Sequence, residues 1–378
     1  MGAPMFSPTV NRLLGACFVM ALAIPLGATL AGVDRTPALE ENRERAAWPG
    51  TPASRAEWAA WPEAFTRWFT DHVAFRTDLI RTQARVRVEA LHSSANPDVI
   101  VGREGWLYYT DDGGLEEIGA HRPFSDEELE AWRTTLTHTR DWLQARGIAY
   151  LFVIAPDKPV IYPEYLPPTV QRVGAQSRTA QLMQHLRAHD PLPVLDLTDT
   201  LREARRHERV YHLTDTHWNE LGAYAAYQAV IAQLQPLGVG EPRPRRDFRV
   251  VPFTRPGMDL ARMLGLMNVM QEVDLRLEFA APRRATVIEP NPPSRALMDA
   301  RVVTTQPGPW PRAVVFRDSF GSAMIPYLSE HFGRAVYAWQ PNIDLDLIAQ
   351  ERPAVVIQEW VGRHFYRVYP YDAVAAQQ

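Results

Sequence analysis

The chain has 378 residues, 46% of them hydrophobic and 22% charged, which is typical of a folded protein with a large core. Its formal net charge of −4 gives no reason to expect nucleic acid as a partner. The single cysteine, Cys17, excludes an intrachain disulfide and a cysteine-based metal site. Any nucleophilic chemistry must therefore use another side chain.

The N-terminal segment departs from the pattern of a soluble protein. Residues 13–33 (LLGACFVMALAIPLGATLAGV) carry no charge and are long enough to cross a ~30 Å hydrocarbon core as a helix. Arg12 precedes the segment and Asp34 follows it, which favours an N-terminus in the cytoplasm and the remainder outside. We expect an uncleaved anchor. A cleaved signal peptide and a buried core helix are the alternatives.

The chain after this segment divides by composition. Residues 34–57 are polar and contain prolines, as in a linker, and residues 58–378 form one α/β domain. Residues 236–310 are rich in proline and arginine and interrupt the pattern of that domain. We interpret them as an insertion with some β-structure.

The predicted elements alternate along the domain. Apolar residues at helical spacing predict two amphipathic helices within 58–91, whose aromatic residues belong to a core, and 99–109 predicts a hairpin that turns at 102–105. Helices are then predicted at 125–146, 177–189, 220–234, 322–332 and 344–351, and strands at 149–155, 193–197, 313–316, 335–338 and 354–358. Such alternation predicts a mostly parallel sheet in a three-layer α/β/α domain.

A serine lies where one of these strands ends. The motif Phe316-Arg317-Asp318-Ser319-Phe320-Gly321 places the Ser319 hydroxyl between a strand and a helix, the edge at which open α/β sheets bind ligands. Backbone N–H groups at such a turn can stabilise the oxyanion of an attacked ester. The alternative is that Asp318 and Ser319 only cap the helix.

A second motif supplies the groups that would activate this serine. In Thr214-Asp215-Thr216-His217-Trp218-Asn219, directly before helix 220–234, Asp-x-His offers a base and the carboxylate that orients it. Asp215, His217 and Ser319 therefore form a candidate triad. A single Asp-x-His gives too few ligands for a metal site, and the scattered histidines His207, His212 and His331 are expected at the surface.

Both motifs resemble those of the SGNH-hydrolase-like domain of the periplasmic alginate O-acetyltransferases, the AlgX and AlgJ type. The resemblance extends over nearly the whole chain after the N-terminal segment and includes Asp215-x-His217-Trp218-Asn219 and Asp318-Ser319-Phe320. Further matching stretches are 41–43, 71–76, 105–108, 161–167, 259–261 and 263–264. In the wider SGNH group a glycine usually precedes Asp-Ser, and this chain has Arg317 instead.

The resemblance implies that residues 58–378 are an SGNH-hydrolase-like domain in the periplasm, held at the inner membrane or released by cleavage. It implies Ser319 as nucleophile, His217 as base, Asp215 as orienting carboxylate and no cofactor or metal. The implied reaction passes an acetyl group through Ser319 to a polysaccharide hydroxyl, with a membrane-bound O-acyltransferase as donor. Arg317 and Asn219 are candidates to support the oxyanion.

Aromatic side chains are candidates to stack on the sugar. For each of them core packing is the favoured alternative: Trp106, Tyr108, Trp218, Trp339 and Trp360.

Two other functions use the same features. A carbohydrate acetylesterase would share the triad and pass the acetyl group to water, and a non-catalytic glycan-binding assembly subunit would keep only the fold. The sequence leaves the acetylated polymer open.

Overall fold

The computed structural model describes residues 7–32, 44–189, 191–289 and 301–377. The chain forms two compact units, Met1–Ala95 and Asn96–Gln378. The α/β domain therefore begins later than the boundary expected at 57/58. The two helices predicted for its start belong to the first unit, because they pack with residues of that unit.

The first unit contains helices α1 (Pro8–Leu30), α2 (Arg55–His72) and α3 (Arg76–Glu89). Within α1, Arg12–Thr29 is long and apolar enough to cross a membrane by length and composition, a test that a signal sequence also passes. Trp48 packs edge-on against Trp61 and Trp68, but Trp48 is 55% exposed and the aromatic side chains of α2 are at most half-buried, so this stripe is a partly exposed aromatic cluster and not the predicted core. Part of the predicted linker, residues 34–43, lies outside the described residues.

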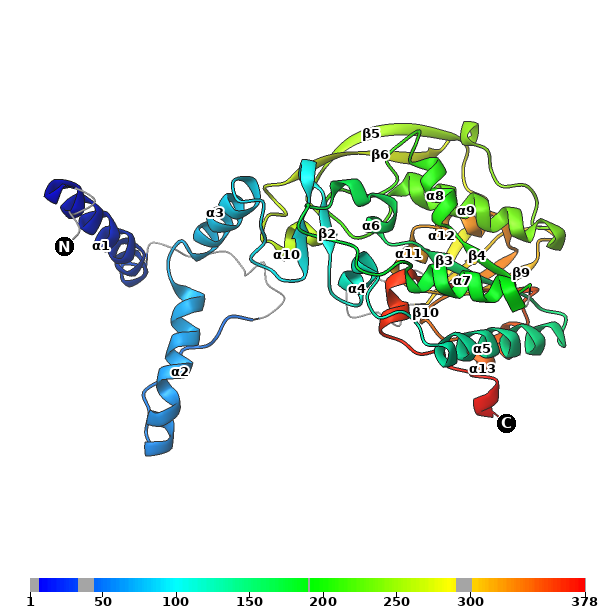
Figure 1. Cartoon of the computed structure of the whole chain (residues 1–378), viewed down its shortest axis with the longest axis horizontal. Helices are drawn as coiled ribbons and strands as arrows, with labels where there is room; N and C mark the ends of the chain where they lie inside the picture. The colour runs from blue at the N-terminus through cyan, green and yellow to red at the C-terminus, as the bar shows by residue number, and fades with distance from the viewer. Residues whose placement is uncertain (1–6, 33–43, 190, 290–300, 378) are drawn as a thin grey trace. The chain divides into compact units, whose positions relative to one another are not determined.

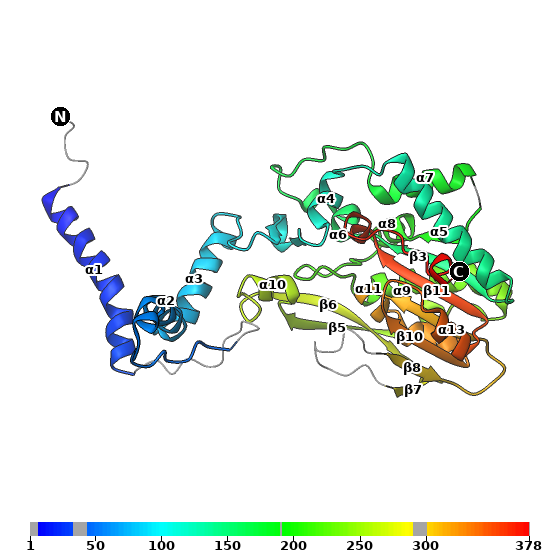
Figure 2. The same cartoon turned by 90° about the horizontal axis from the view of Figure 1, so that it is seen from below.

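The second unit is built on a seven-stranded sheet with the order β4-β3-β11-β9-β10-β8-β7 (Figures 1 and 2). The five strands from β4 to β10 are parallel, and β8 and β7 continue the sheet antiparallel. The strands are β3 (Ala149–Ala155), β4 (Val194–Asp196), β7 (Thr286–Glu289), β8 (Val302–Thr305), β9 (Arg312–Arg317), β10 (Arg334–Trp339) and β11 (Val355–Val361). Separate antiparallel pairs are β1 (Val99–Val101) with β2 (Leu107–Tyr109), and β5 (Phe248–Pro256) with β6 (Gln271–Phe279).

Helices cover both faces of the sheet (Figure 1). On one face α8, α9 and α12 pack against inward side chains such as Val153, Val315 and Ile357. On the other, α5, α7 and α13 pack against Phe152, Val314 and Trp360. The helices are α4 (Gly114–Gly119), α5 (Asp126–Gln144), α6 (Lys158–Ile161), α7 (Arg178–His189), α8 (Thr198–Ala204), α9 (Glu220–Leu234), α10 (Asp259–Met263), α11 (Ser319–Ser322), α12 (Ile325–Leu328) and α13 (Leu345–Glu351). This is the predicted three-layer α/β/α arrangement.

The long helix predicted at 322–332 is wrong. Two short helices, α11 and α12, and a 3₁₀ turn at Ser329–His331 occupy this stretch. Pro326 lies in the first turn of α12, where its missing N–H is tolerated, but inside one continuous helix it would remove a hydrogen bond. The chain therefore starts a new helix at this proline.

The interpretation of 236–310 as an insertion needs correction in part. Strands β5 and β6 form a separate ribbon, as the expectation of β-structure suggests. Strands β7 and β8, however, join the central sheet through β10, so the end of this stretch is part of the main domain. Residues 290–300 lie outside the described residues.

Candidate active site

Ser319 sits in a tight turn at the carboxyl end of β9. The cap of α11 is Asp318, whose Oδ1 accepts the Phe320 N–H at 2.8 Å and whose Oδ2 accepts the Val361 N–H of β11 at 2.8 Å. The turn has no space for a side chain at Gly321, where a Cβ would lie 2.7 Å from both Arg317 Cβ and Glu359 Oε2. Because Asp318 does the capping, the Ser319 hydroxyl remains free for another partner.

A buried carboxyl group supports this turn from β11. Glu359 Oε2 accepts the N–H groups of Asp318 at 3.2 Å and Gly321 at 3.0 Å. Burial, aided by the Asp318 charge, raises the pKa of Glu359 well above its usual range. Within the described residues the Ser319 N–H has no acceptor, which leaves it as the donor that this turn offers to an oxyanion.

The three predicted side chains form a hydrogen-bonded chain. His217 Nε2 lies 2.7 Å from Ser319 Oγ, and His217 Nδ1 lies 2.8 Å from Asp215 Oδ1. Burial opposes the charge of Asp215, but its hydrogen bond with His217 and the nearby imidazoles outweigh this and lower its pKa. Asp215 is buried, whereas the His217 side chain is 25% exposed. The geometry is that of a serine, a base and an orienting carboxylate, open to solvent at the serine end.

A small hairpin presents the Asp215–His217 loop. Tyr211 and Trp218 form an antiparallel bridge, and the His212 N–H donates to the His217 carbonyl at 3.2 Å. Beyond the bridge, Asn219 Oδ1 accepts the Leu221 and Gly222 N–H groups and so caps α9. The hairpin fixes the loop at the start of the long helix.

Lys158 holds this loop from inside, and sequence reasoning missed it. Its ammonium is fully buried and donates to the carbonyls of His212, Leu213 and Asp215. Burial lowers the pKa of Lys158 to about 7, against the opposing charges of Asp215 and Glu272. The composition could have singled out this residue, because Lys158 is the only lysine in a chain with 39 arginines. An ammonium with three rotatable donors fits three converging carbonyls better than a planar guanidinium does.

The β5–β6 ribbon adds a buried charge cluster behind the same loop. His212 Nδ1 lies 2.8 Å from Asp274 Oδ2 and 3.3 Å from Glu272 Oε1. Glu272 Oε2 also accepts the Leu213 and Thr214 N–H groups. The prediction that His212 lies at the surface is wrong, and His331 is likewise buried, whereas His207 is exposed.

This cluster has the residue types of a metal site but the spacing of an ion pair. Ligand atoms about 2.0–2.1 Å from one zinc ion in tetrahedral geometry lie farther apart than the 2.8 Å between His212 and Asp274. Arg209 also approaches Asp274, at 3.5 Å. Burial opposes a charge on His212, but Asp274 and Glu272 outweigh this and raise its pKa, so the cluster is best described as an imidazolium between carboxylates.

The other predicted site residues make hydrogen bonds or packing contacts within the domain. Asn219 Nδ2 donates to the Arg209 carbonyl and to Asp274 Oδ1, and buried Arg317 donates to the Asp318 carbonyl and Ser322 Oγ. The Asn219 donors are therefore directed away from an oxyanion, whereas Nε and Nη2 of Arg317 have no partner among the described residues, so Arg317 stays a candidate to support it. Tyr108 and Trp218 are buried and donate to the Tyr162 and Phe320 carbonyls, so neither can stack on a sugar. Trp106 and Trp360 are also core residues, and Trp339 packs under the Arg317 guanidinium.

Comparisons with known proteins identify the family of the chain. Residues 99–306, more than half of the chain, match the family model described as SGNH hydrolase-like domain, acetyltransferase AlgX. The chain is 34% identical over 159 residues to a probable alginate O-acetylase AlgJ of Pseudomonas syringae pv. tomato, and 32% identical over 160 residues to the one of Pseudomonas fluorescens. Each alignment covers 40% of this chain and 38% of the relative. The match thus spans well under half the length of these relatives.

Among solved structures, the chain is similar to PatB1 of Bacillus cereus, solved with a sulfonyl adduct. The TM-score is 0.51 at 14% identity, and the match covers 70% of this chain and 96% of that chain. At this identity the likeness supports the fold.

Proposed function

Because the chain belongs to the SGNH hydrolase-like AlgX acetyltransferase family, we propose that it is a polysaccharide O-acetyltransferase that works through an acetyl-serine at Ser319. One observation carries the proposal: His217 bridges Asp215 Oδ1 and Ser319 Oγ at 2.8 and 2.7 Å. The names of the AlgJ relatives add the acetylase chemistry.

The first step transfers an acetyl group from the donor to Ser319. His217 Nε2 takes the proton of Ser319 as Oγ attacks the carbonyl carbon of an acetyl ester, and the leaving alkoxide of the donor receives that proton. The Asp215 carboxylate keeps Nδ1 protonated and stabilises the imidazolium. The Ser319 N–H donates to the oxyanion of the tetrahedral intermediate.

The second step transfers the acetyl group from Ser319 to the acceptor. A sugar hydroxyl gives its proton to His217 Nε2 and attacks the acetyl carbon, and the Ser319 oxygen leaves and is reprotonated. Since the His217 side chain is 25% exposed, water can reach the same carbon. The acceptor must therefore occupy the site closely enough to exclude water.

The family resemblance suggests the donor, and the N-terminal segment supports the location. Helix α1 is long and apolar enough to cross a membrane, which would keep the enzyme in the periplasm beside the inner membrane. A membrane-bound O-acyltransferase that delivers acetyl groups across that membrane is the partner this arrangement suits.

The test gives the purified full-length chain an activated acetyl ester, with and without oligosaccharide acceptors. We expect an acetylated oligosaccharide in the mass spectrum and none from Ser319→Ala. Acetate release that no acceptor changes would instead identify an acetylesterase. In cells, polymer acetylation that survives Ser319→Ala at normal protein levels would identify a non-catalytic assembly subunit.

A further inference from the structure

Helix α2 of the first unit carries a row of aromatic side chains on one face. Trp61, Phe65 and Phe69 follow one another at intervals of four residues, and their rings stack in sequence. At about 100° per residue this spacing keeps the rings on one side of the helix. We define the aromatic face of α2 by these three residues and three neighbours: Trp48, Trp58, Trp61, Phe65, Trp68 and Phe69.

The described residues leave the aromatic face partly uncovered. Trp58 is 60% exposed, Trp48 is about as exposed, and the other four rings are at most half-buried. Helix α3 adds Leu79 and Val86, which are seven residues apart on one side of that helix and more than half exposed. A contiguous exposed apolar patch of this kind marks a contact surface.

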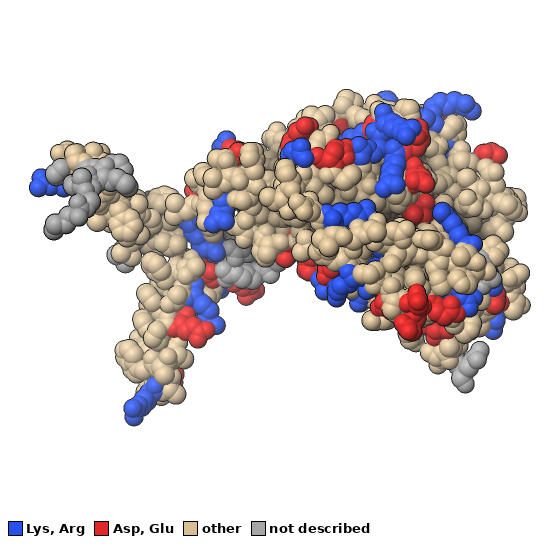
Figure 3. Space-filling view, viewed as in Figure 1, with Lys and Arg blue, Asp and Glu red and all other residues tan. Residues whose placement is uncertain are grey.

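The opposite side of α2 is polar. Glu63 and Arg67 form an ion pair there, with 3.8 Å between the charged atoms and both side chains well exposed. Glu63 lies about half a turn around the helix from the centre of the aromatic face. On the side seen in Figure 3, charged side chains lie along one edge of α2 and at one end, and the rest of its surface is uncharged. A helix with one aromatic and one polar side suits the boundary between an apolar phase and water.

Helix α1 provides such a boundary next to α2. Its segment Arg12–Thr29 is long and apolar enough to cross a membrane, and none of that segment is buried within the described chain. The junction between α2 and α3 contacts the end of this segment, because the Ala74 N–H donates to Thr29 Oγ1 at 2.8 Å. Thr29 is the residue at which a spanning α1 would reach the headgroup region. The junction of α2 and α3 would then lie at the membrane surface.

The composition of the aromatic face suits the headgroup region. Four of the eleven tryptophans of the chain lie between residues 48 and 68. Tryptophan gathers at membrane–water interfaces because its ring is apolar and its N–H is polar.

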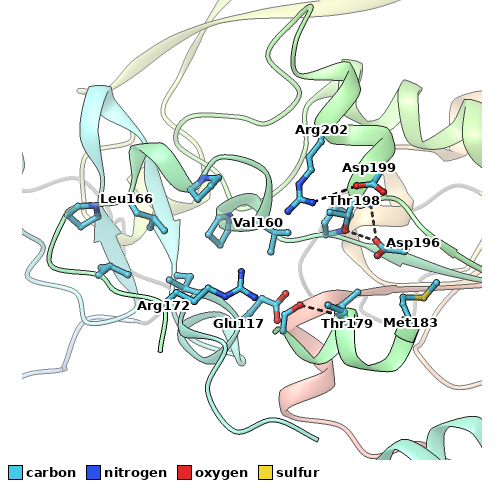
Figure 4. A pocket seen from close by; sticks show the side chains of 18 of the residues that line it. Glu117, Val160, Leu166, Arg172, Thr179, Met183, Asp196, Thr198, Asp199 and Arg202 are labelled. Atoms are coloured by element: carbon cyan, nitrogen blue, oxygen red, sulfur yellow. Dashed lines mark hydrogen bonds and ion pairs between the residues drawn. The ribbon is translucent and has the colours of Figure 1, made fainter. Parts of the chain in front are cut away.

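The tryptophans of the second unit are less exposed. Within the described residues of that unit, none is as exposed as Trp48 or Trp58. A hollow between α4, α7 and α8 in the second unit instead has charged side chains on its wall, among them the ion pair of Arg202 with Asp199 (Figure 4). The exposed tryptophans are thus gathered beside the helix that can cross a membrane.

We propose that α2 lies in the headgroup region of the membrane that α1 crosses. Its aromatic face contacts the phospholipids, and the side that carries Glu63 and Arg67 faces water. The partner is therefore a phospholipid surface. The proposal rests on a membrane-crossing α1, as in the proposed location, and is independent of the acetyl-serine chemistry.

The test places a nitrobenzoxadiazole label, which fluoresces more strongly outside water, on either side of α2. In the full-length chain with Cys17→Ser, the label is attached after Trp58→Cys or after Glu63→Cys, two exposed positions on opposite sides. Each chain is reconstituted into vesicles of phosphatidylethanolamine and phosphatidylglycerol. The fluorescence of the label at position 58 should rise severalfold, and that of the matched label at position 63 should stay at its value in water.

Tryptophan quenching by lipids with brominated acyl chains gives a second readout without a label. Helix α1 contains no tryptophan, so any quenching by the bilayer must come from other segments. The double variant Trp48→Tyr, Trp58→Tyr keeps aromatic rings on α2 and should reduce the quenching severalfold. The matched control is Trp142→Tyr, a partly exposed position on α5, which should leave the quenching unchanged.

Three outcomes would overturn the proposal. In chains that float with the vesicles, equal fluorescence at positions 58 and 63 would show that the aromatic face lies in water. A rise at position 58 that requires a high ratio of protein to lipid would assign the face to a second copy of the chain. Chains that do not float with the vesicles would exclude both the anchor and the lipid contact. The variant Ser319→Ala should give the same fluorescence as the unchanged serine, so a failure of acetyl transfer leaves this readout intact.

Discussion

The two halves of the candidate active site are held in different ways. The Ser319 turn is fixed by neighbouring strands of the parallel sheet, through Asp318, Val361 and a buried Glu359 carboxyl. The Asp215–His217 loop is fixed by buried charges from distant segments, Lys158 after β3 and Glu272 in the ribbon. The position of the nucleophile is thus a property of the parallel sheet, whereas that of the base also depends on a few buried hydrogen bonds between charged side chains and the loop backbone.

The largest effect is expected at the nucleophile itself. Ser319→Ala removes the atom that carries the acetyl group and should lower the transfer rate by about 10⁴–10⁶-fold. The fold should be unaffected, because the capping of α11 is done by Asp318. Transfer rates and melting temperatures of both proteins check this. A residual rate within tenfold of the wild type would remove Ser319 from the mechanism.

The next largest effect tests whether buried charge holds the base. Lys158→Met leaves three carbonyls without their donor, which should cost about 3 kcal/mol and lower the melting temperature by about 6–12 °C. Displacement of His217 should also reduce the transfer rate by about 10²-fold.

The matched variant is Lys158→Arg, which keeps the charge. A guanidinium is too large and too planar for this fully buried position, so it should not restore activity. Wild-type activity in Lys158→Arg would show that charge alone is enough and that the three-carbonyl geometry is not needed.

The contrast between the Ser319 turn and the Asp215–His217 loop also explains how much of the site could be predicted from the sequence. Strand 149–155, helix 220–234 and the three residues of the candidate triad, whose side chains are hydrogen-bonded in the structure, were predicted from local patterns, because turns and periodicity depend on neighbours in sequence. The roles of Glu272 and Asp274 depend on how the ribbon folds back over the loop, which no local pattern contains. Asn219 and Tyr108 were assigned to the substrate because their residue types suit it, whereas burial gave them structural partners.

A smaller effect is expected from pH on stability, through His212 behind the Asp215–His217 loop. Since the folded pKa of His212 is raised above its unfolded value, its contribution to stability is present below the unfolded pKa and is lost as pH rises through the folded pKa. Between pH 6 and pH 8.5 the wild type should therefore lose more melting temperature, or gain less, than His212→Gln, in which the other titrating groups such as Lys158 are unchanged. At pH 6 His212→Gln should cost about 1–2 kcal/mol. An unchanged pH dependence in His212→Gln would assign it to other groups.

The smallest effect on stability and transfer rate is expected from Glu359→Gln in the Ser319 turn. The pKa of Glu359 is raised well above its usual range by burial, so the turn is built around a neutral carboxyl, and Glu359→Gln keeps an oxygen that accepts the Asp318 and Gly321 N–H groups. The change in unfolding free energy should stay below about 1 kcal/mol, with transfer rates within a few fold. Glu359→Ala, which leaves both N–H groups without an acceptor, should cost about 1–3 kcal/mol or more. If Glu359→Gln proved as damaging as Glu359→Ala, the turn would require an ionised carboxylate, and both halves of the site would then depend on buried charge.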